Sequence, residues 1–224
     1  MKKKKALVLG ATGLVGSHLL RALDTSSFFQ SITAFTRKKS LNQSSDKISE
    51  VVIDYSRKES YVAFLNVDDI FCCLGTTMKQ AKTKENFRQV DFGYPYEIAR
   101  AGKKSGCKRF FLLTAIGSDK NSSVFYNKVK GEIEDAITEL NFESTFIFRP
   151  SFLEGHRKET RAGETMGIGF MNLLKPISFG LLNKILPIKA EVVAQSMLQA
   201  AQSDLKGRHI FTSDVMQKGL FYEN

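Results

Sequence analysis

The chain has 224 residues, of which 42% are hydrophobic and 25% are charged. These values are ordinary for a globular protein, so they exclude a disordered or collagen-like chain and supply enough apolar residues for one sizeable core. The net charge of +10 favours anionic partners such as nucleotides, phosphorylated metabolites, nucleic acid or acidic lipid, without selecting one. The length predicts a single domain over residues 1–224, in which residues 151–224 contribute a cap on the substrate side.

The cysteines and the apolar segments indicate a compartment. Cys72, Cys73 and Cys107 are too few for a disulfide framework and lack the spacing of metal ligands, so we expect no metal site. The sequence contains no run of about 18 uncharged apolar residues, so no membrane span is expected. Lys2–Lys5 and the apolar stretch after them are similar to the start of a signal peptide, but glycines interrupt that stretch and no cleavage site follows. We therefore expect a cytoplasmic protein.

Short apolar runs alternate with helical patterns along the chain. Strands are predicted at Ala6–Leu9, Ser31–Thr36, Glu50–Asp54, Ile70–Leu74, Arg109–Leu113, Thr145–Phe148 and His209–Thr212. Helices are predicted at Gly13–Leu23, Lys84–Lys104, Ser123–Leu140 and Ala190–Gln202. This alternation is typical of an α/β fold with a doubly wound parallel sheet.

A glycine-rich turn joins the first predicted strand to the first predicted helix. The first glycine of such a turn allows a tight bend, the second lets backbone amides approach a pyrophosphate, and the third lets helix and strand pack closely. The unpaired N–H groups at the helix start attract the phosphates. We therefore predict a Rossmann-type dinucleotide site, with a purely structural turn as the alternative. Its residues are Gly10, Thr12, Gly13, Leu14, Val15 and Gly16.

Basic residues follow the second predicted strand. Dinucleotide folds that prefer NAD place an acidic residue at this point to hold the ribose 2′-hydroxyl. This chain has Arg37 and Lys38 instead, and a guanidinium can grip a 2′-phosphate in forked geometry. The sequence therefore predicts that NADP(H) is preferred over NAD(H). The alternative is that these residues form only a solvated turn.

A tyrosine and a lysine are the candidate catalytic pair. Tyr126 and Lys130 lie four residues apart on the helix predicted after the fifth strand, and so share one face of it. A nearby ammonium group would lower the pKa of the phenol, which could then donate a proton to a carbonyl oxygen. The alternative is a surface tyrosine beside a solvated lysine.

Together these features resemble the short-chain dehydrogenase/reductase superfamily. A closer similarity is to the Tat-interactive-protein-like branch of its atypical members. The similar segments cover most of the chain, and the last of them is specific to the branch. They are Phe71–Thr77, Val90-Asp91, Gly106–Phe110, Val129–Glu132, Phe148–Pro150 and Arg157–Glu164.

The resemblance implies further binding roles. Besides the pyrophosphate and 2′-phosphate sites it implies an adenine site, a nicotinamide-ribose site and a nicotinamide site. Asp54 and Tyr55 would flank the adenine. The nicotinamide ribose would be lined by Leu74, Gly75, Thr76 and Lys130, and the nicotinamide would be bordered by Pro150 and Ser151.

The chain departs from the superfamily at the catalytic serine. Ala115 stands at that position, and Thr114 and Ser118 are the candidates to supply a hydroxyl in its place. Loss of one such donor costs on the order of 10²–10³ in rate. The departure therefore affects turnover more than cofactor binding. Because members of the branch are also linked to regulatory roles, the resemblance leaves a weak or absent enzymatic activity as an alternative.

Three further features have two interpretations each. In the segment 157–164, Arg157 and Arg161 would either face an anionic group of the substrate or belong to a solvated, salt-bridged loop. The apolar segment 166–187 predicts a helical lid, with contact to a membrane surface as the alternative. Cys72 and Cys73 are interpreted as buried packing residues, with a redox pair as the alternative.

The leading prediction is an NADPH-dependent reductase of a small carbonyl compound that acts as a monomer or homodimer. The alternative is a catalytically weak, NADPH-binding regulator that senses the cofactor and binds a protein partner. Nucleic-acid binding is suggested only by the net charge, and because no base-reading motif supports it, we expect none.

Overall fold

The computed structural model describes residues 3–41, 45–154 and 186–220. Its main sheet has the order β3-β2-β1-β4-β5-β6-β9, and every neighbouring pair is parallel. A second sheet pairs β7 (Leu153–Glu154) with β8 (Ile188–Lys189). The predicted α/β fold with a Rossmann-type sheet is confirmed. The strands of the main sheet are β1 (Lys4–Leu9), β2 (Phe29–Thr36), β3 (Ile48–Val52), β4 (Asp69–Cys72), β5 (Arg109–Leu113), β6 (Ser144–Arg149) and β9 (Gly207–Thr212).

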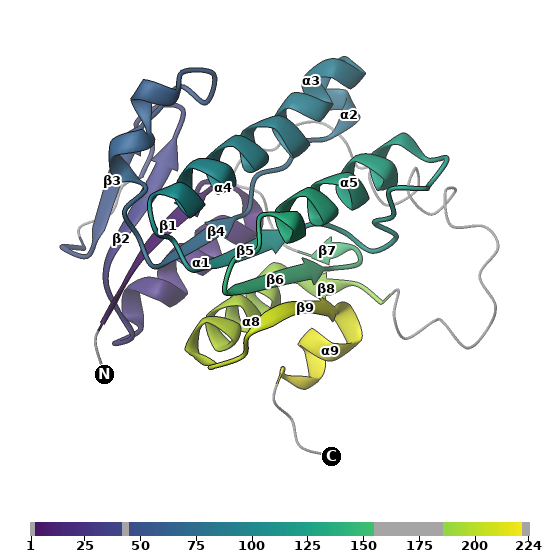
Figure 1. Ribbon diagram of the computed structural model, residues 1–224. Coiled ribbons are helices and arrows are strands. Elements are labelled where there is room, and N and C mark those ends of the chain that lie inside the picture. Colours follow the sequence, from purple (N-terminus) through teal and green to yellow (C-terminus); the bar gives the residue numbers. More distant parts are fainter. Residues whose placement is uncertain (1–2, 42–44, 155–185, 221–224) are drawn as a thin grey trace.

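Helices cover both faces of the sheet (Figure 1). On one face, α1 (Leu14–Thr25) packs against α8 (Ala190–Gln202). On the other face lie α4 (Tyr94–Lys104) and α5 (Phe125–Glu139). Shorter segments are α2 (Met78–Ala81), α3 (Lys84–Arg88), α9 (Ser213–Lys218), the π-helical η3 (Gln89–Gly93) and the 3-10 turns η1 (Lys58–Ser60) and η2 (Val62–Phe64).

The central strands are buried on both faces. In β1, Val8 joins the core under α1 and α8, whereas Leu9 joins the core under α4 and α5. Continuous apolar runs are needed for this arrangement, which is why the strands could be predicted from them. Across β4, β5 and β6 the rings of Phe71, Phe111 and Phe146 stack in register, with centroid separations of 4.3 and 4.7 Å.

Some element boundaries differ from the prediction. β3 ends at Val52 rather than Asp54, and β4 ends at Cys72 rather than Leu74. Asp54 turns the chain, because its carboxylate accepts hydrogen bonds from N and Oγ of Ser56 at 2.9 and 2.7 Å. The long helix predicted before β5 is present as α3, η3 and α4 in succession, with a π-helical turn interrupting its regular geometry.

The strand order changes direction between β1 and β4. From β1 the chain proceeds to β2 and β3 on one side, and later strands continue from β4 on the other. In doubly wound sheets the carboxyl ends of the strands beside such a switch point form the ligand crevice. The segments Gly10–Gly16 and Cys73–Thr77, which leave β1 and β4, therefore border the crevice.

At the amino end of the strands a buried ion pair joins the sheet to a helix. Arg109 Nε and Nη2 donate to the two carboxylate oxygens of Asp69 at 2.7 and 2.5 Å. The same guanidinium donates to the carbonyl oxygens of Ala201 and Ser203, at the end of α8, at 2.7 and 3.2 Å. One side chain thus ties β4, β5 and α8 together.

Replacement of this guanidinium should destabilise the fold strongly. Arg109→Met leaves the buried Asp69 carboxylate and the two carbonyls of α8 without their donor, so we expect the free energy of unfolding to fall by about 3–5 kcal/mol. Urea denaturation at neutral pH measures it. The control Arg100→Met removes an exposed partner of Glu97 on α4 and should change nothing measurable. Equal stability of the two variants would contradict the role of Arg109.

Candidate active site

The glycine turn leaves no room for side chains at two positions. Gly10 has a φ of +73°, and a Cβ built on it would lie 2.6 Å from the carbonyl oxygen of Cys73. A Cβ on Gly16 would lie 2.1 Å from the carbonyl oxygen of Gly10. Glycine is therefore required for the turn to pack against the end of β4, and for α1 to pack against the turn. These contacts explain the first and third glycines of the motif.

The start of α1 suits an anionic group. Gly13 is the N-cap of α1 and, having no side chain, makes no capping hydrogen bond. The first N–H groups of the helix and the positive end of its dipole are thus left for a ligand. Thr12 and Gly13 are exposed, and Leu14 is half-buried. A pyrophosphate fits these residues because its oxygens can accept from backbone donors at a helix N-terminus.

The loop after β2 carries Arg37 and Lys38 at the surface. Glu50 of β3, to which no sequence motif points, holds this loop. Its carboxylate accepts hydrogen bonds from Thr36 Oγ1 at 2.9 Å and from Ser40 N at 2.8 Å. Burial raises the pKa of Glu50, but these hydrogen bonds outweigh it and hold the pKa below its ordinary value. The Glu50 carboxylate is therefore engaged by the loop after β2, and Arg37 and Lys38 stay exposed.

Tyr55 connects this loop to the glycine turn. Its buried ring stacks on Tyr94 with centroids 5.2 Å apart, and its phenol lies near the backbone of Gly10. Burial raises the pKa of Tyr55 well above its ordinary value, although Arg37 lies close enough to oppose the rise. Gly10, Tyr55 and Arg37 are thus neighbours on the β2 side of the crevice, while Asp54 is exposed beside them.

On the β4 side of the crevice, Lys130 is buried against a carboxylate. Its Nζ lies 2.7 Å from Oδ1 of Asp91, whose Oδ2 accepts a hydrogen bond from Thr76 N at 2.9 Å. A Cβ on the exposed Gly75 would lie 3.7 Å from Lys130 Nζ. The structure therefore brings Lys130 together with the turn over residues 74–76. It adds Asp91, which the sequence shows only as part of the Val90-Asp91 similarity.

Tyr126 lies one helical turn before Lys130 and packs against Phe87, with ring centroids 5.6 Å apart. Burial raises the pKa of Tyr126 above its ordinary value, while Lys130 lowers it and Asp91 raises it. Lys130 acts in the expected direction, but the expected net lowering of the Tyr126 pKa is wrong, because burial and the carboxylate outweigh the ammonium. A phenol that stays protonated is suited to donate a proton rather than to accept one.

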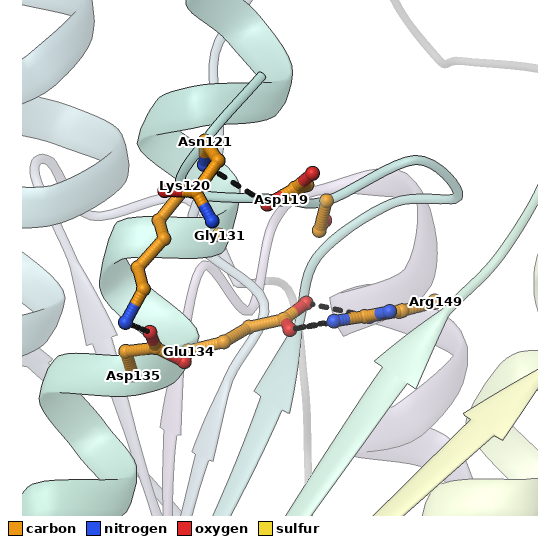
Figure 2. A pocket seen from close by; sticks show the side chains of 8 residues that line it. Asp119, Lys120, Asn121, Gly131, Glu134, Asp135 and Arg149 are labelled. Carbon is orange, nitrogen blue, oxygen red and sulfur yellow. Dashed lines mark hydrogen bonds and ion pairs between the residues drawn. The ribbon is translucent and has the colours of Figure 1, made fainter.

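The hydroxyls considered as replacements for the missing serine both donate within the protein. Thr114 Oγ1 donates to Glu134 Oε1, and Ser118 Oγ donates to the carbonyl oxygen of Ala115, each at 2.6 Å. Glu134 on α5 is also ion-paired with Arg149 at the end of β6 (Figure 2). Their action on a substrate stays a prediction. In the structure, Thr114 connects the end of β5 to α5 through Glu134. The ion pair of Glu134 with Arg149 extends this connection to β6.

A pocket of about 220 Å³ lies between the loop after β5, helix α5 and the end of β6 (Figure 2). Four of the five charged side chains that line it are paired: Lys120 Nζ lies 2.6 Å from Asp135 Oδ2, and Arg149 pairs with Glu134. The fifth, Asp119, accepts a hydrogen bond from Asn121 N at 2.9 Å. The loop packs directly on α5, since a Cβ on Gly131 would lie 2.1 Å from Lys120 N. Because carboxylates outnumber cations in its lining, this pocket does not suit an anionic ligand.

Pro150 and Ser151 leave β6 at the same edge of the sheet as the other candidate residues. Pro150 is buried, and Ser151 N donates to Ser213 Oγ at 2.7 Å, which anchors this segment to the start of α9. Two predicted features lie outside the described residues: the substrate residues Arg157 and Arg161, and positions 166–185 of the expected lid.

The cysteines beside the crevice are poorly suited to redox chemistry. Cys72 and Cys73 are free thiols at the end of β4. Burial raises the pKa of Cys72 to about 12 and raises the pKa of Cys73 as well. Because the thiolate is the reactive form, these shifts favour inert packing over a redox pair.

Comparison with known proteins gives consistent similarities. Residues 6–145 match the model of the NAD dependent epimerase/dehydratase family. Protein HTATIP2 of Rattus norvegicus is 36% identical over 78% of this chain and 73% of its own length. Protein FMP52-1 of Scheffersomyces stipitis is 35% identical over 90% of this chain and 89% of its own. The solved oxidoreductase ylbE from Lactococcus lactis is 20% identical, covers 98% of both chains and has a TM-score of 0.65, which shows a shared fold.

The expected cytoplasmic location is contradicted by these similarities. The FMP52 relatives from Scheffersomyces stipitis, Candida albicans and Aspergillus niger are all named as mitochondrial proteins. Unpaired cysteines indicate only that disulfides do not form, and they do not single out the cytosol among such compartments. Within the described residues, no helix is long and apolar enough to cross a membrane.

The contact between Thr114 and Glu134 can be tested by a pair of variants. Thr114→Val keeps the side-chain shape but removes the hydroxyl, so a buried carboxylate loses a donor and the free energy of unfolding should fall by about 1–3 kcal/mol. Thr114→Ser keeps the donor and should lose only about 1 kcal/mol for the missing methyl group. Urea denaturation compares them. A valine variant as stable as the native protein would exclude a structural role for this hydroxyl.

Proposed function

This chain belongs to the NAD dependent epimerase/dehydratase family, and from this premise we propose that it is an NADPH-dependent reductase of a small carbonyl compound. The family match and the relatives also confirm the resemblance to the short-chain dehydrogenase/reductase superfamily and its Tat-interactive-protein-like branch. The observation that carries the proposal is the position of Lys130 beside the turn 74–76 at the switch point of the sheet, with Tyr126 one helical turn before it on α5.

The cofactor would be held by residues from three strand ends. A nicotinamide cofactor supplies a hydride when bound. Gly10–Gly16 would hold its pyrophosphate at the start of α1, and Arg37 with Lys38 would hold the 2′-phosphate. Lys130 and the turn 74–76 would hold the nicotinamide ribose. The exposed basic loop and the uncapped helix start support this assignment.

Tyr126 would act as the proton donor. Its phenol stays protonated across the physiological pH range because burial and Asp91 oppose ionisation. In the reduction of a carbonyl group, the carbonyl oxygen would take this proton as the carbon takes the hydride. Lys130 would orient the ribose and place a positive charge near the phenolate that forms. The ammonium is suited to this task because it is already fixed by Asp91.

A second candidate function is a cofactor-sensing regulator. It is favoured by Ala115 at the usual serine position and by the internal hydrogen bonds of Thr114 and Ser118. With these donors engaged, the oxyanion of a substrate would have fewer partners. Such a protein would bind NADPH at the same site but convert few or no carbonyl compounds, and it would contact a protein partner in a cofactor-dependent way.

Calorimetric titration with NADPH and with NADH tests the cofactor. We expect tight binding of NADPH and much weaker binding of NADH. Arg37→Gln should weaken NADPH binding by roughly 10–100-fold, the value of one charge-assisted hydrogen bond, and leave NADH binding unchanged. The matched control Arg208→Gln removes an exposed arginine from β9, on the far edge of the sheet, and should bind like the native protein. Equal affinity for both cofactors would refute the role of Arg37.

Turnover and its pH dependence test the proton donor. Tyr126→Phe should reduce turnover of any carbonyl substrate by roughly 10²–10⁴-fold and leave NADPH affinity nearly unchanged. Because burial raises the pKa of Tyr126, the phenol stays protonated at pH values up to the ordinary tyrosine pKa. The native rate should therefore fall only above about pH 10. An unchanged rate in the phenylalanine variant excludes Tyr126 as the donor. No turnover of a broad carbonyl panel by the native protein, despite tight NADPH binding, would favour the regulator.

A further inference from the structure

We propose that Asp91 is a positioning residue that fixes the Lys130 ammonium against the turn 74–76 and so prepares the ribose site. The inference deepens the proposed function and rests on it for the identity of the ligand. The two oxygens of one carboxylate serve two segments: Oδ1 lies 2.7 Å from Lys130 Nζ, and Oδ2 accepts the hydrogen bond from Thr76 N at 2.9 Å. Asp91 thereby connects η3, the turn after β4 and helix α5.

The local backbone is built to present this carboxylate. Asp91 is the central residue of η3, a π-helical turn between α3 and α4. Such turns are rare, and they occur often at functional sites because the extra residue redirects side chains. Here the turn directs the side chain of Asp91, which is charged and fully buried, toward the crevice. A buried carboxylate is costly to keep in the fold, and its two partners offset that cost.

The ammonium depends on this carboxylate. The side chain of Lys130 is only 6% exposed, and burial alone would lower the pKa of Lys130. Asp91 is the main group that opposes the burial, and together with Tyr126 and Cys72 it holds the pKa of Lys130 above its ordinary value. Without the carboxylate, the lysine would lose its charge within an accessible pH range. Its long, flexible side chain would also lose the partner that directs it toward Gly75.

A single conservative variant separates charge from shape. Asp91→Asn keeps an oxygen that can accept from Thr76 N, so the turn and the fold should be retained, but it removes the negative charge opposite Lys130. Asp91→Ala removes the contacts with both Lys130 and Thr76, and it shows how much stability is lost with them. The matched control is Glu97→Gln, which neutralises an exposed carboxylate of α4 whose partner is Arg100. Thermal unfolding of each variant establishes that it is folded.

The first measurement needs no cofactor. Lysine labelled with ¹³C at Cε is titrated by NMR, and the Lys130 resonance is assigned by its absence in Lys130→Arg. We expect the native Lys130 to stay protonated throughout the titration to pH 11, and the Asp91→Asn protein to show a pKa of Lys130 below its ordinary ~10.4. The Glu97→Gln protein should titrate like the native one. An unshifted Lys130 in Asp91→Asn would overturn the proposal.

The second measurement is calorimetric NADPH affinity at pH 7 and pH 9. Asp91→Asn should bind roughly tenfold more weakly than the native protein, with a larger loss at pH 9 where its Lys130 is partly neutral. A shifted Lys130 with unchanged affinity at both pH values would also overturn the proposal. If the native protein binds no NADPH, the proposed function fails, and the Lys130 titration alone then decides whether Asp91 holds the ammonium.

Discussion

The close approach of the glycine turn to the end of β4 is the constraint from which the rest of the site follows. A side chain on Gly10 would meet the carbonyl of Cys73 at 2.6 Å, and one on Gly16 would meet the carbonyl of Gly10 at 2.1 Å. Only with glycine at both positions can the turn lie against β4 while α1 begins directly after it. The start of α1 and the turn 74–76 are thereby brought to the same crevice, where the strand order changes direction.

Three ion pairs, each with a buried carboxylate, then fix the elements on the sheet. On α5, Lys130 pairs with Asp91, and Glu134, one helical turn further along, pairs with Arg149. At the other end of the strands, Asp69 pairs with Arg109. Buried pairs gain little net stability over apolar contacts, but removal of one partner is costly. Their effect here is to specify how α5, η3 and α8 sit on the sheet, and α5 carries both proposed catalytic residues.

The fold and part of the site could be predicted because their signals are local in the sequence. Apolar runs that end in glycine indicate buried parallel strands, and Gly10–Gly16 indicates the phosphate-binding turn. The four-residue spacing of Tyr126 and Lys130 also needs no tertiary information. Asp91 could not be assigned a role in this way, because it meets Lys130 only after α3, η3 and α4 have packed beside α5.

The remaining differences have causes that local sequence patterns do not contain. The pKa of Tyr126 depends on its burial and on Asp91, neither of which a tyrosine–lysine spacing reveals. The loop bearing Arg37 is held by Glu50, whose hydrogen bonds to Thr36 and Ser40 join residues 14 and 10 positions apart. The cytoplasmic expectation is wrong because free cysteines indicate only the absence of disulfides and do not identify the compartment.

The most direct test of the site is a crystal structure of the protein grown with NADP⁺. The cofactor should span the crevice, with its pyrophosphate at the start of α1, its 2′-phosphate within hydrogen-bonding distance of Arg37, about 3 Å, and its nicotinamide ribose on Lys130. NADP⁺ bound elsewhere on the molecule, or a crevice without cofactor at saturating concentration, would contradict the assignment of this switch point as the cofactor site.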